Sequence, residues 1–181
     1  MRLVNLFNGD CAFEEWQKCR LPGEALVWRE SYLWGPLPPP GTPWREFNRL
    51  RAPRLHAGAP EIAESDILAE LDEMHNRLFS LGPEDRLILW FDHCPFDRTM
   101  LSRILALLAD MPVPPQTELI CADVVWDQAA FKAGFRNGIR LGADEFAVGQ
   151  SEWSEYLRGK RADELLSRLI SPTSELNGEK S

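Results

Sequence analysis

The chain has 181 residues, of which 44% are hydrophobic and 27% are charged, and its formal net charge is −8 at pH 7. This length suits one well-buried domain with a small appendage. The acidic balance argues against a general nucleic-acid or membrane-surface role, which would require a basic face. No apolar run reaches the roughly 20 residues that a membrane-spanning helix needs, so we expect no membrane partner.

Apolar runs bounded by turn residues predict four strands, and apolar positions repeated every three to four residues predict the helices between them. In chain order, the predicted elements are strand 3–7, helix 12–19, strand 25–28, helix 44–55, helix 65–81, strand 86–91, helix 96–109 and strand 117–122. The stretch 35–43 is rich in proline, which fixes φ and removes a backbone donor, so we expect a stiff extended loop there.

The pattern weakens after the fourth predicted strand. The expected elements are a helical turn over 127–133, a turn at Asn137-Gly138, and helices over 152–157 and 162–170. We therefore predict three parts: a sheet domain over residues 1–125, a helical appendage over 126–171 packed on it, and a disordered tail over 172–181.

Strands that alternate with helices favour a parallel sheet, because parallel neighbours need a crossover connection. The predicted fold is therefore α/β: an open, mainly parallel, four-stranded sheet of Rossmann-like type. We expect helices on both faces of the sheet and a C-terminal helical appendage. In such a sheet the carboxyl ends of the strands share one edge, and ligands bind there.

Polar residues follow the end of each predicted strand, and an acid is among them every time. They are Asn8, Gly9, Asp10 and Cys11 after the first strand, Arg29 and Glu30 after the second, Asp92 and His93 after the third, and Asp123 after the fourth. Because these ends meet at one edge of a parallel sheet, we expect the side chains to line an acidic crevice.

The residues after the first strand each allow a structural and a functional interpretation. Asp10 would cap the following helix, or its carboxylate would bind a metal, a ribose hydroxyl or a proton. Gly9 suits a left-handed turn, and it would also let a ligand approach the helix N-terminus. Cys11 is either an inert thiol or a nucleophile whose thiolate the helix N-terminus favours.

The later strand ends have similar alternatives. His93 is a polar residue at a helix start, or an imidazole that a neighbouring acid such as Asp92 orients and activates. Glu30 is a site carboxylate or a solvated loop acid. Trp34, beside Gly35, belongs to the core wall or covers a pocket.

Several motifs that identify common enzyme classes are absent. The sequence contains no G-x-G-x-x-G, G-x-x-x-x-G-K-[ST], H-E-x-x-H or G-x-S-x-G pattern. Their absence argues against a standard dinucleotide enzyme, P-loop NTPase, zinc protease or α/β-hydrolase. The four cysteines form no C-x-x-C pair and no zinc-like spacing, so we expect free thiols and a cytoplasmic protein.

Three short motifs in a fixed order resemble an uncharacterised bacterial domain family of unknown function: FNGDC at 7–11, VWRESYLWGPL at 27–37 and LILWFDHCPFDRTML at 87–101. Members of that family open with a strand ending in Gly-Asp-Ser, then carry an acid before Gly-Pro-Leu and later a Trp-ended strand. Cys11 and Glu30 stand where the family usually has Ser and Asp. The resemblance spans about residues 3–170; it implies one α/β domain and supplies no activity.

Two main hypotheses follow. In the first, a nucleotide-like or phosphorylated small molecule binds in the acidic crevice, with Mg²⁺ as a cofactor that offsets the carboxylates. Metal-assisted catalysis would then use Asp10, Asp92 and His93. The expected ligand contacts are Asn8, Gly9, Cys11, Glu30, Trp34 and Gly35. In the second, the protein is a non-catalytic interaction or regulatory module that uses the proline-rich loop and exposed tryptophans. Arginines clustered between residues 45 and 54 leave nucleic-acid binding as a third alternative.

Overall fold

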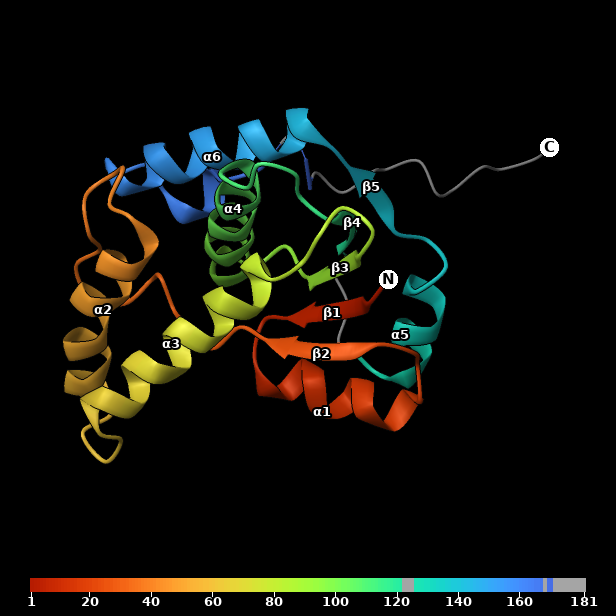
Figure 1. Cartoon of the computed structure of the whole chain (residues 1–181), viewed down its shortest axis with the longest axis horizontal. Coiled ribbons are helices and arrows are strands. Elements are labelled where there is room, and N and C mark those ends of the chain that lie inside the picture. Colours follow the sequence, from red (N-terminus) through yellow and green to blue (C-terminus); the bar gives the residue numbers. More distant parts are fainter. Residues whose placement is uncertain (122–125, 168, 171–181) are drawn as a thin grey trace.

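A computed structural model of the chain describes residues 1–121, 126–167 and 169–170 (Figure 1). Its elements are β1 (Leu3–Phe7), α1 (Asp10–Cys19), β2 (Glu24–Val27), α2 (Trp44–Gly58), α3 (Glu64–Phe79), β3 (Arg86–Phe91), α4 (Pro95–Ala109), β4 (Gln116–Cys121), α5 (Gln128–Gly134), β5 (Ile139–Leu141), α6 (Ala143–Leu157) and the 3₁₀ turn η1 (Ala162–Glu164). The predicted strand end at Asp123 and the predicted tail over 172–181 lie outside the described residues.

The strands form one sheet in the order β2-β1-β3-β4-β5. The pairs β1–β2, β1–β3 and β3–β4 are parallel, and β5 pairs antiparallel with β4. The predicted mainly parallel α/β sheet is therefore confirmed, but the sheet has five strands rather than four. The fifth strand has only three residues, of which two are exposed, so its apolar pattern is too short to indicate a strand.

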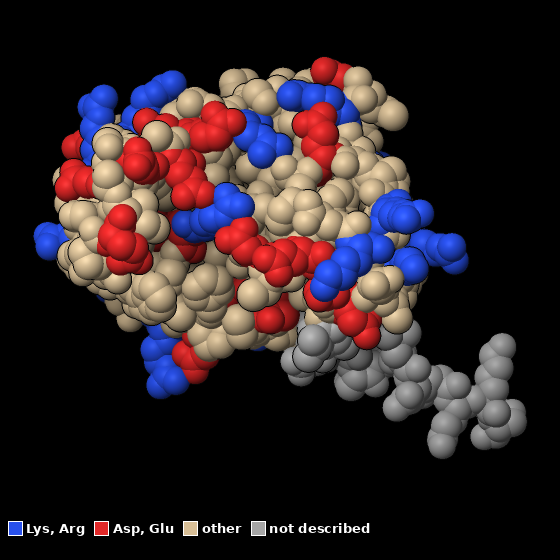
Figure 2. All heavy atoms as spheres, turned by 90° about the horizontal axis from the view of Figure 1, so that it is seen from below, with Lys and Arg blue, Asp and Glu red and all other residues tan. Residues whose placement is uncertain are grey.

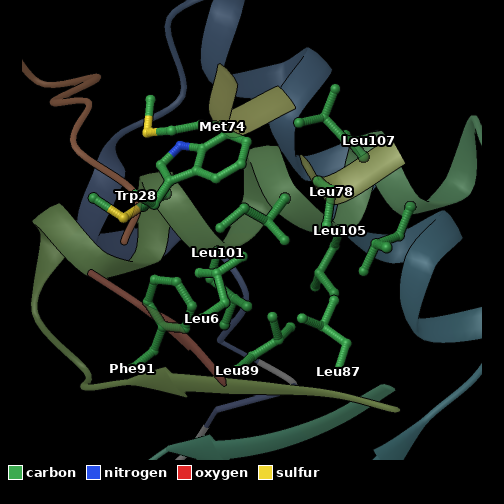
Figure 3. Close-up of a cluster of buried hydrophobic side chains, with 14 of the residues drawn as sticks. Leu6, Trp28, Met74, Leu78, Leu87, Leu89, Phe91, Leu101, Leu105 and Leu107 are labelled. Carbon is green, nitrogen blue, oxygen red and sulfur yellow. The ribbon is translucent and has the colours of Figure 1, made fainter. Parts of the chain in front are cut away.

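Each side of the sheet has its own hydrophobic cluster, because alternate residues of a strand point to opposite sides. Leu87, Leu89 and Phe91 of β3 pack with side chains of α3, α4 and α6, as Figure 3 shows for part of this cluster. Ile88 and Trp90 pack on the other side with α1 and α5. Burial on both faces explains the unbroken apolar run of β3.

Helix α4 lies between the sheet and α6 (Figure 1), and most of its residues are buried. The two helices approach closely at Gly149 of α6, where a Cβ atom would lie 2.2 Å from Cβ of Leu105. Ser102 strengthens this contact because its hydroxyl donates to the carbonyl of Gly149 at 3.2 Å. A residue without a side chain is therefore required at this crossing.

The C-terminal helices differ from the prediction in extent. Helix α6 begins at Ala143, well before the predicted start, and the N–H of Gly142 is satisfied by the Glu145 carboxylate at 2.7 Å. Gly149 lowers the helical propensity of this stretch and hides its first half from a pattern analysis. The predicted helix over 162–170 is wrong, since only Ala162–Glu164 forms a 3₁₀ turn among its described residues.

Acidic and basic side chains are interspersed on the face shown in Figure 2, rather than gathered into broad fields of one sign. Exposed ion pairs such as Arg29–Glu70, at 2.7 Å, are of this mixed kind. Within the described ranges, no helix combines the length and the apolar character that crossing a membrane demands.

We predict that Gly149→Ala destabilises the protein by about 1–3 kcal/mol, because the new methyl group overpacks the α4–α6 contact. This loss outweighs the helical propensity of alanine, which alone would add about 1 kcal/mol. Gly58→Ala, at the end of α2 where a Cβ meets open space, is the matched control and leaves stability unchanged or higher. Urea unfolding curves check both; equal effects of the two substitutions would contradict close packing at Gly149.

Candidate functional site

The strand order of the sheet reverses between β1 and β3, since β2 lies on one side of this pair and β4 on the other. In doubly wound sheets, ligands bind outside the carboxyl ends of the strands at such a reversal. Asn8 directly follows β1 and Asp92 directly follows β3. The topology therefore places these two predicted site residues side by side at the expected position.

A network of hydrogen bonds joins the two strand ends to the start of α4, with Asp97 at its centre. The side-chain amide of Asn8 donates to both carboxylate oxygens of Asp97, at 2.6 and 2.8 Å. The backbone N–H of Asp92 donates to the same carboxylate at 2.7 Å. Cys94 is the N-cap of α4; its Sγ accepts from the N–H of Asp97 at 3.4 Å, and its own N–H donates to the Asp92 carboxylate at 2.7 Å.

Burial dominates the electrostatics of this network. Asp97 has no exposed surface, and burial raises the pKa of its carboxyl group to about 6 although the hydrogen bonds from Asn8 and Asp92 oppose the rise. Burial also raises the pKa of the Cys94 thiol to about 12, so this thiol is protonated near neutral pH. No ion pair joins Asp97 to a basic side chain within the described residues.

Three side chains of this network, those of Asp92, Cys94 and Asp97, are close enough to hold one cation. Ligand atoms of Asp92, Cys94 and Asp97 lie within 4.8 Å of one another. Two carboxylates at this spacing suit a hard divalent cation, which prefers oxygen ligands. A protonated thiol adds little to such a site, because the thiolate is the form that binds metals.

Asp10 is engaged in a separate set of ion pairs. Arg29 donates from Nε and Nη2 to the Asp10 carboxylate at 2.7 to 3.0 Å, and its Nη1 donates to Glu70 of α3 at 2.7 Å. The predicted capping role of Asp10 is wrong: Gly9 is the N-cap of α1, and Asp10 is the first residue of that helix. Gly9 has φ of +126° and ψ of −177°, so it is an extended positive-φ residue rather than the predicted left-handed turn, and this conformation also favours glycine.

Glu30 forms a buried ion pair with Arg51 of α2, which has no exposed surface. Nη2 of Arg51 donates to Oε1 of Glu30 at 2.8 Å. The same guanidinium donates to the carbonyls of Ser31, Trp34 and Pro36, at 2.9 to 3.3 Å. Glu30 is thus not a solvated acid: together with Arg51 it anchors the start of the proline-rich loop.

The remaining predicted residues are more accessible. His93 is half-buried; its carbonyl accepts from Nε of Arg98 at 2.8 Å, and its imidazole forms no hydrogen bond within the part of the chain that the structure describes. Cys11 is exposed. Trp34 is 70% exposed, and Gly35 beside it has φ of +69°.

The structure therefore connects Asn8 and Asp92 through the Asp97 carboxylate. Over the described ranges, no hydrogen bond links either residue to the side chains of the other predicted site residues Asp10, Glu30 and His93. Asp97 and Arg51 are the important residues that the site prediction omits. Asp97 occupies the first turn of a predicted helix, where a side chain can reach back toward the strand end. Arg51 lies at helical spacing from the buried Phe47, which indicates burial but not its partner.

Comparison of the chain with protein-family models, with curated proteins and with solved structures found no match. The resemblance to the uncharacterised bacterial domain family therefore stays a prediction. A function has to be argued from the geometry of the chain's own residues.

We predict that Asp97 gives stability a distinct pH dependence. Its folded-state pKa of about 6 lies above the ordinary value of 3.8, so the folded protein holds this proton more tightly than the unfolded chain. The stabilisation is complete below about pH 4 and is lost as the pH rises through about 6, with an amplitude on the order of 2–3 kcal/mol. Asp97→Asn removes this component, as urea unfolding across that pH range checks.

His75 titrates in the opposite sense and must be separated from Asp97. Burial lowers the pKa of His75 to about 4, so its contribution falls as the pH drops from about 6.5 toward 4. This contribution is the same in both proteins and cancels in the difference between wild type and Asp97→Asn. Parallel stability–pH curves for the two proteins would show that Asp97 does not titrate as proposed.

The buried Glu30–Arg51 pair gives a second prediction. Glu30→Gln leaves a buried guanidinium without its counter-charge and should lower the free energy of unfolding by about 3 kcal/mol or more. Glu70→Gln removes one exposed partner of Arg29 and should cost less than about 1 kcal/mol. Chemical unfolding compares the two; a loss for Glu30→Gln as small as that for Glu70→Gln would refute the anchoring role.

Proposed function

We propose that the protein binds a small phosphorylated or nucleotide-like molecule, together with a divalent cation such as Mg²⁺, at the carboxyl ends of β1 and β3. The observation that supports this most strongly is the buried Asp97 carboxylate, held by Asn8 and the backbone of Asp92 at the point where the strand order reverses. This is the position at which doubly wound sheets bind ligands.

A cation is part of the proposal because the site carries uncompensated negative charge. The raised pKa of Asp97 means that its surroundings favour a bound proton over a bare carboxylate. At a pH above that pKa, a divalent cation would take the place of the proton and neutralise the carboxylate charge, with Asp92 and Asp97 as its oxygen ligands. Mg²⁺ usually keeps several waters and is completed by substrate phosphates, so a phosphate group would complete the coordination.

Neighbouring residues supply the other contacts of the proposed ligand. A Cβ on Gly9 would meet no atom of the described residues within 4 Å, and we infer that the backbone at the start of α1 is open to a phosphate, which helix N-terminal N–H groups bind well. His93 follows Asp92 directly, and we assign it proton transfer in a metal-assisted reaction. Asp10, paired with Arg29, would orient that arginine at the rim.

A second candidate function rests on a different observation. Trp34 and Leu33 are adjacent and are 70% and 41% exposed, and exposed aromatic residues are enriched at protein interfaces. The Glu30–Arg51 anchor holds this segment in place. In this alternative the protein is a non-catalytic interaction module. For either function we place it in the cytoplasm, because its four cysteines are widely spaced and form no C-x-x-C pair.

Calorimetric titration with Mg²⁺, at a pH above the pKa of Asp97, tests the proposed function. Wild type should bind the cation, and Asp97→Asn should weaken binding by at least about tenfold, the usual effect of altering a metal-site residue. Asp66→Asn, at an exposed acid in the first turn of α3 outside the network, is the matched control and should leave the affinity unchanged. ADP and inorganic phosphate, titrated after Mg²⁺, then report the ligand class.

Circular dichroism of each variant verifies that it is folded before binding is compared. Absence of Mg²⁺ binding by wild type, or equal loss in the two variants, would count against the cation site. Self-association that rises with protein concentration and disappears in Trp34→Ala would instead favour the interaction module.

A further inference from the structure

A cleft of about 810 Å³ lies between α4, α6 and the proline-rich loop that precedes α2. It includes none of the residues of the network around Asp97. Its apolar lining includes the aromatic rings of Trp44, Phe47 and Trp153. Its polar lining includes Arg103 of α4 together with Ser151 and Ser154 of α6. The cleft therefore combines an aromatic wall with many polar groups, and in small-molecule sites such polar groups fix the orientation of the ligand.

Arg103 is the unusual member of this lining. Only 6% of its surface is exposed, and its guanidinium carbon lies 4.5 Å from the ring centre of Phe47 and 5.5 Å from that of Trp153. Its Nε and Nη2 atoms are buried without a hydrogen-bond partner among the described residues. Stacking on aromatic faces leaves the planar edge of a guanidinium available for an oxyanion.

Other arginines of this protein show what that edge ordinarily binds. Nε and Nη2 lie on the same side of the guanidinium and together donate to a carboxylate group. Such pairs are formed by Arg2 with Asp85, Arg29 with Asp10, Arg51 with Glu30, Arg86 with Glu118, and Arg161 with Asp163. The equivalent edge of Arg103 is buried and unpaired within the residues that the structure describes.

The acids that line the cleft are already engaged with other side chains. Asp110 accepts a hydrogen bond from Nε2 of Gln150 at 2.8 Å, and Glu155 pairs with Lys160 at 2.9 Å. Burial lowers the pKa of Arg103, although Tyr32 and Asp110 oppose this effect. A second arginine of the lining, Arg158, is exposed and forms no ion pair over the described ranges. Gln150 is neutral, so Asp110 keeps its negative charge and partly offsets that of Arg103. Within the described residues, however, no carboxylate accepts from the Nε–Nη2 edge of Arg103.

We propose that this cleft binds a small organic anion whose carboxylate or phosphate group pairs with the Nε–Nη2 edge of Arg103. The apolar or aromatic body of the anion would pack against Trp44, Phe47 and Trp153. Because the Nε and Nη2 atoms are buried, binding includes a rotation of the Arg103 side chain that turns this edge toward the ligand. The inference concerns a second site and does not rest on the proposed cation site.

Calorimetric titration with phenylacetate and phenyl phosphate, without divalent cations, tests the proposal. At least one of these anions should bind at least about tenfold more tightly than neutral phenylacetamide, because the charge-assisted bidentate bond is missing from the amide. The stronger of the two anions identifies the preferred oxyanion. Arg103→Lys keeps the positive charge but removes the paired Nε and Nη2 donors. It should weaken binding of that anion by about tenfold or more.

Three further variants make the test specific. Arg49→Lys, at an exposed arginine of α2 outside the cleft, is the matched control and leaves binding unchanged. Ser151→Phe fills the cleft from its exposed rim and should abolish binding. It tests the site without changing Arg103, whose substitution could perturb folding. Asp97→Asn leaves binding unchanged, which separates this site from the proposed cation site.

Stability supplies a measurement that needs no ligand. Arg103→Met removes a buried charge whose Nε and Nη2 atoms have no hydrogen-bond partner among the described residues, and it should raise the midpoint of thermal unfolding. A lowered midpoint, equal affinity for phenylacetamide and the anions, absence of binding by either anion, or unchanged binding by Arg103→Lys would each overturn the proposal and leave Arg103 as a structural residue.

Discussion

The burial of α4 between the sheet and α6 is the constraint on which the rest of this structure depends. Its inner face packs on the apolar residues of β3, and its outer face meets α6 where Gly149 allows close contact with Leu105. A helix enclosed on two sides has few positions at which a polar side chain reaches solvent. Two of the polar groups that α4 carries, Asp97 and Arg103, are therefore held in fixed, water-poor surroundings, and both candidate sites are built on them.

Much of the fold could be predicted because its information is local. The buried strands are short apolar runs, and α3 repeats its apolar residues with the helical period, so each is visible within a window of the sequence. Ile139–Leu141 could not be recognised, because a three-residue strand at the sheet edge has almost no pattern. The first half of α6 escaped for a related reason: Gly149, required by a contact with a distant helix, weakens the local helical signal.

The candidate site was harder to predict than the fold, because its chemistry depends on partners that are distant in sequence. A shared acidic crevice was expected from the acids that follow the strands. In the structure two of these acids have their own arginine: Arg29 pairs with Asp10, and Arg51 pairs with Glu30. Neither pairing has a spacing rule that a sequence pattern could reveal. The adjacency of Asn8 and Asp92 agrees with the predicted parallel sheet, but it depends on the pairing of β1 with β3, which the sequence pattern does not reveal.

The anchored proline-rich loop has a consequence for molecular selection at the neighbouring cleft. Arg51 fastens the carbonyls of Trp34 and Pro36, and the far end of the same loop, from Pro39 to Pro43, borders the cleft. Proline has little backbone freedom to lose. The entrance of the cleft therefore keeps much the same dimensions when a ligand binds. A rigid entrance of this kind selects ligands by their size and shape rather than by induced fit. The loop therefore loses little conformational entropy when a ligand binds.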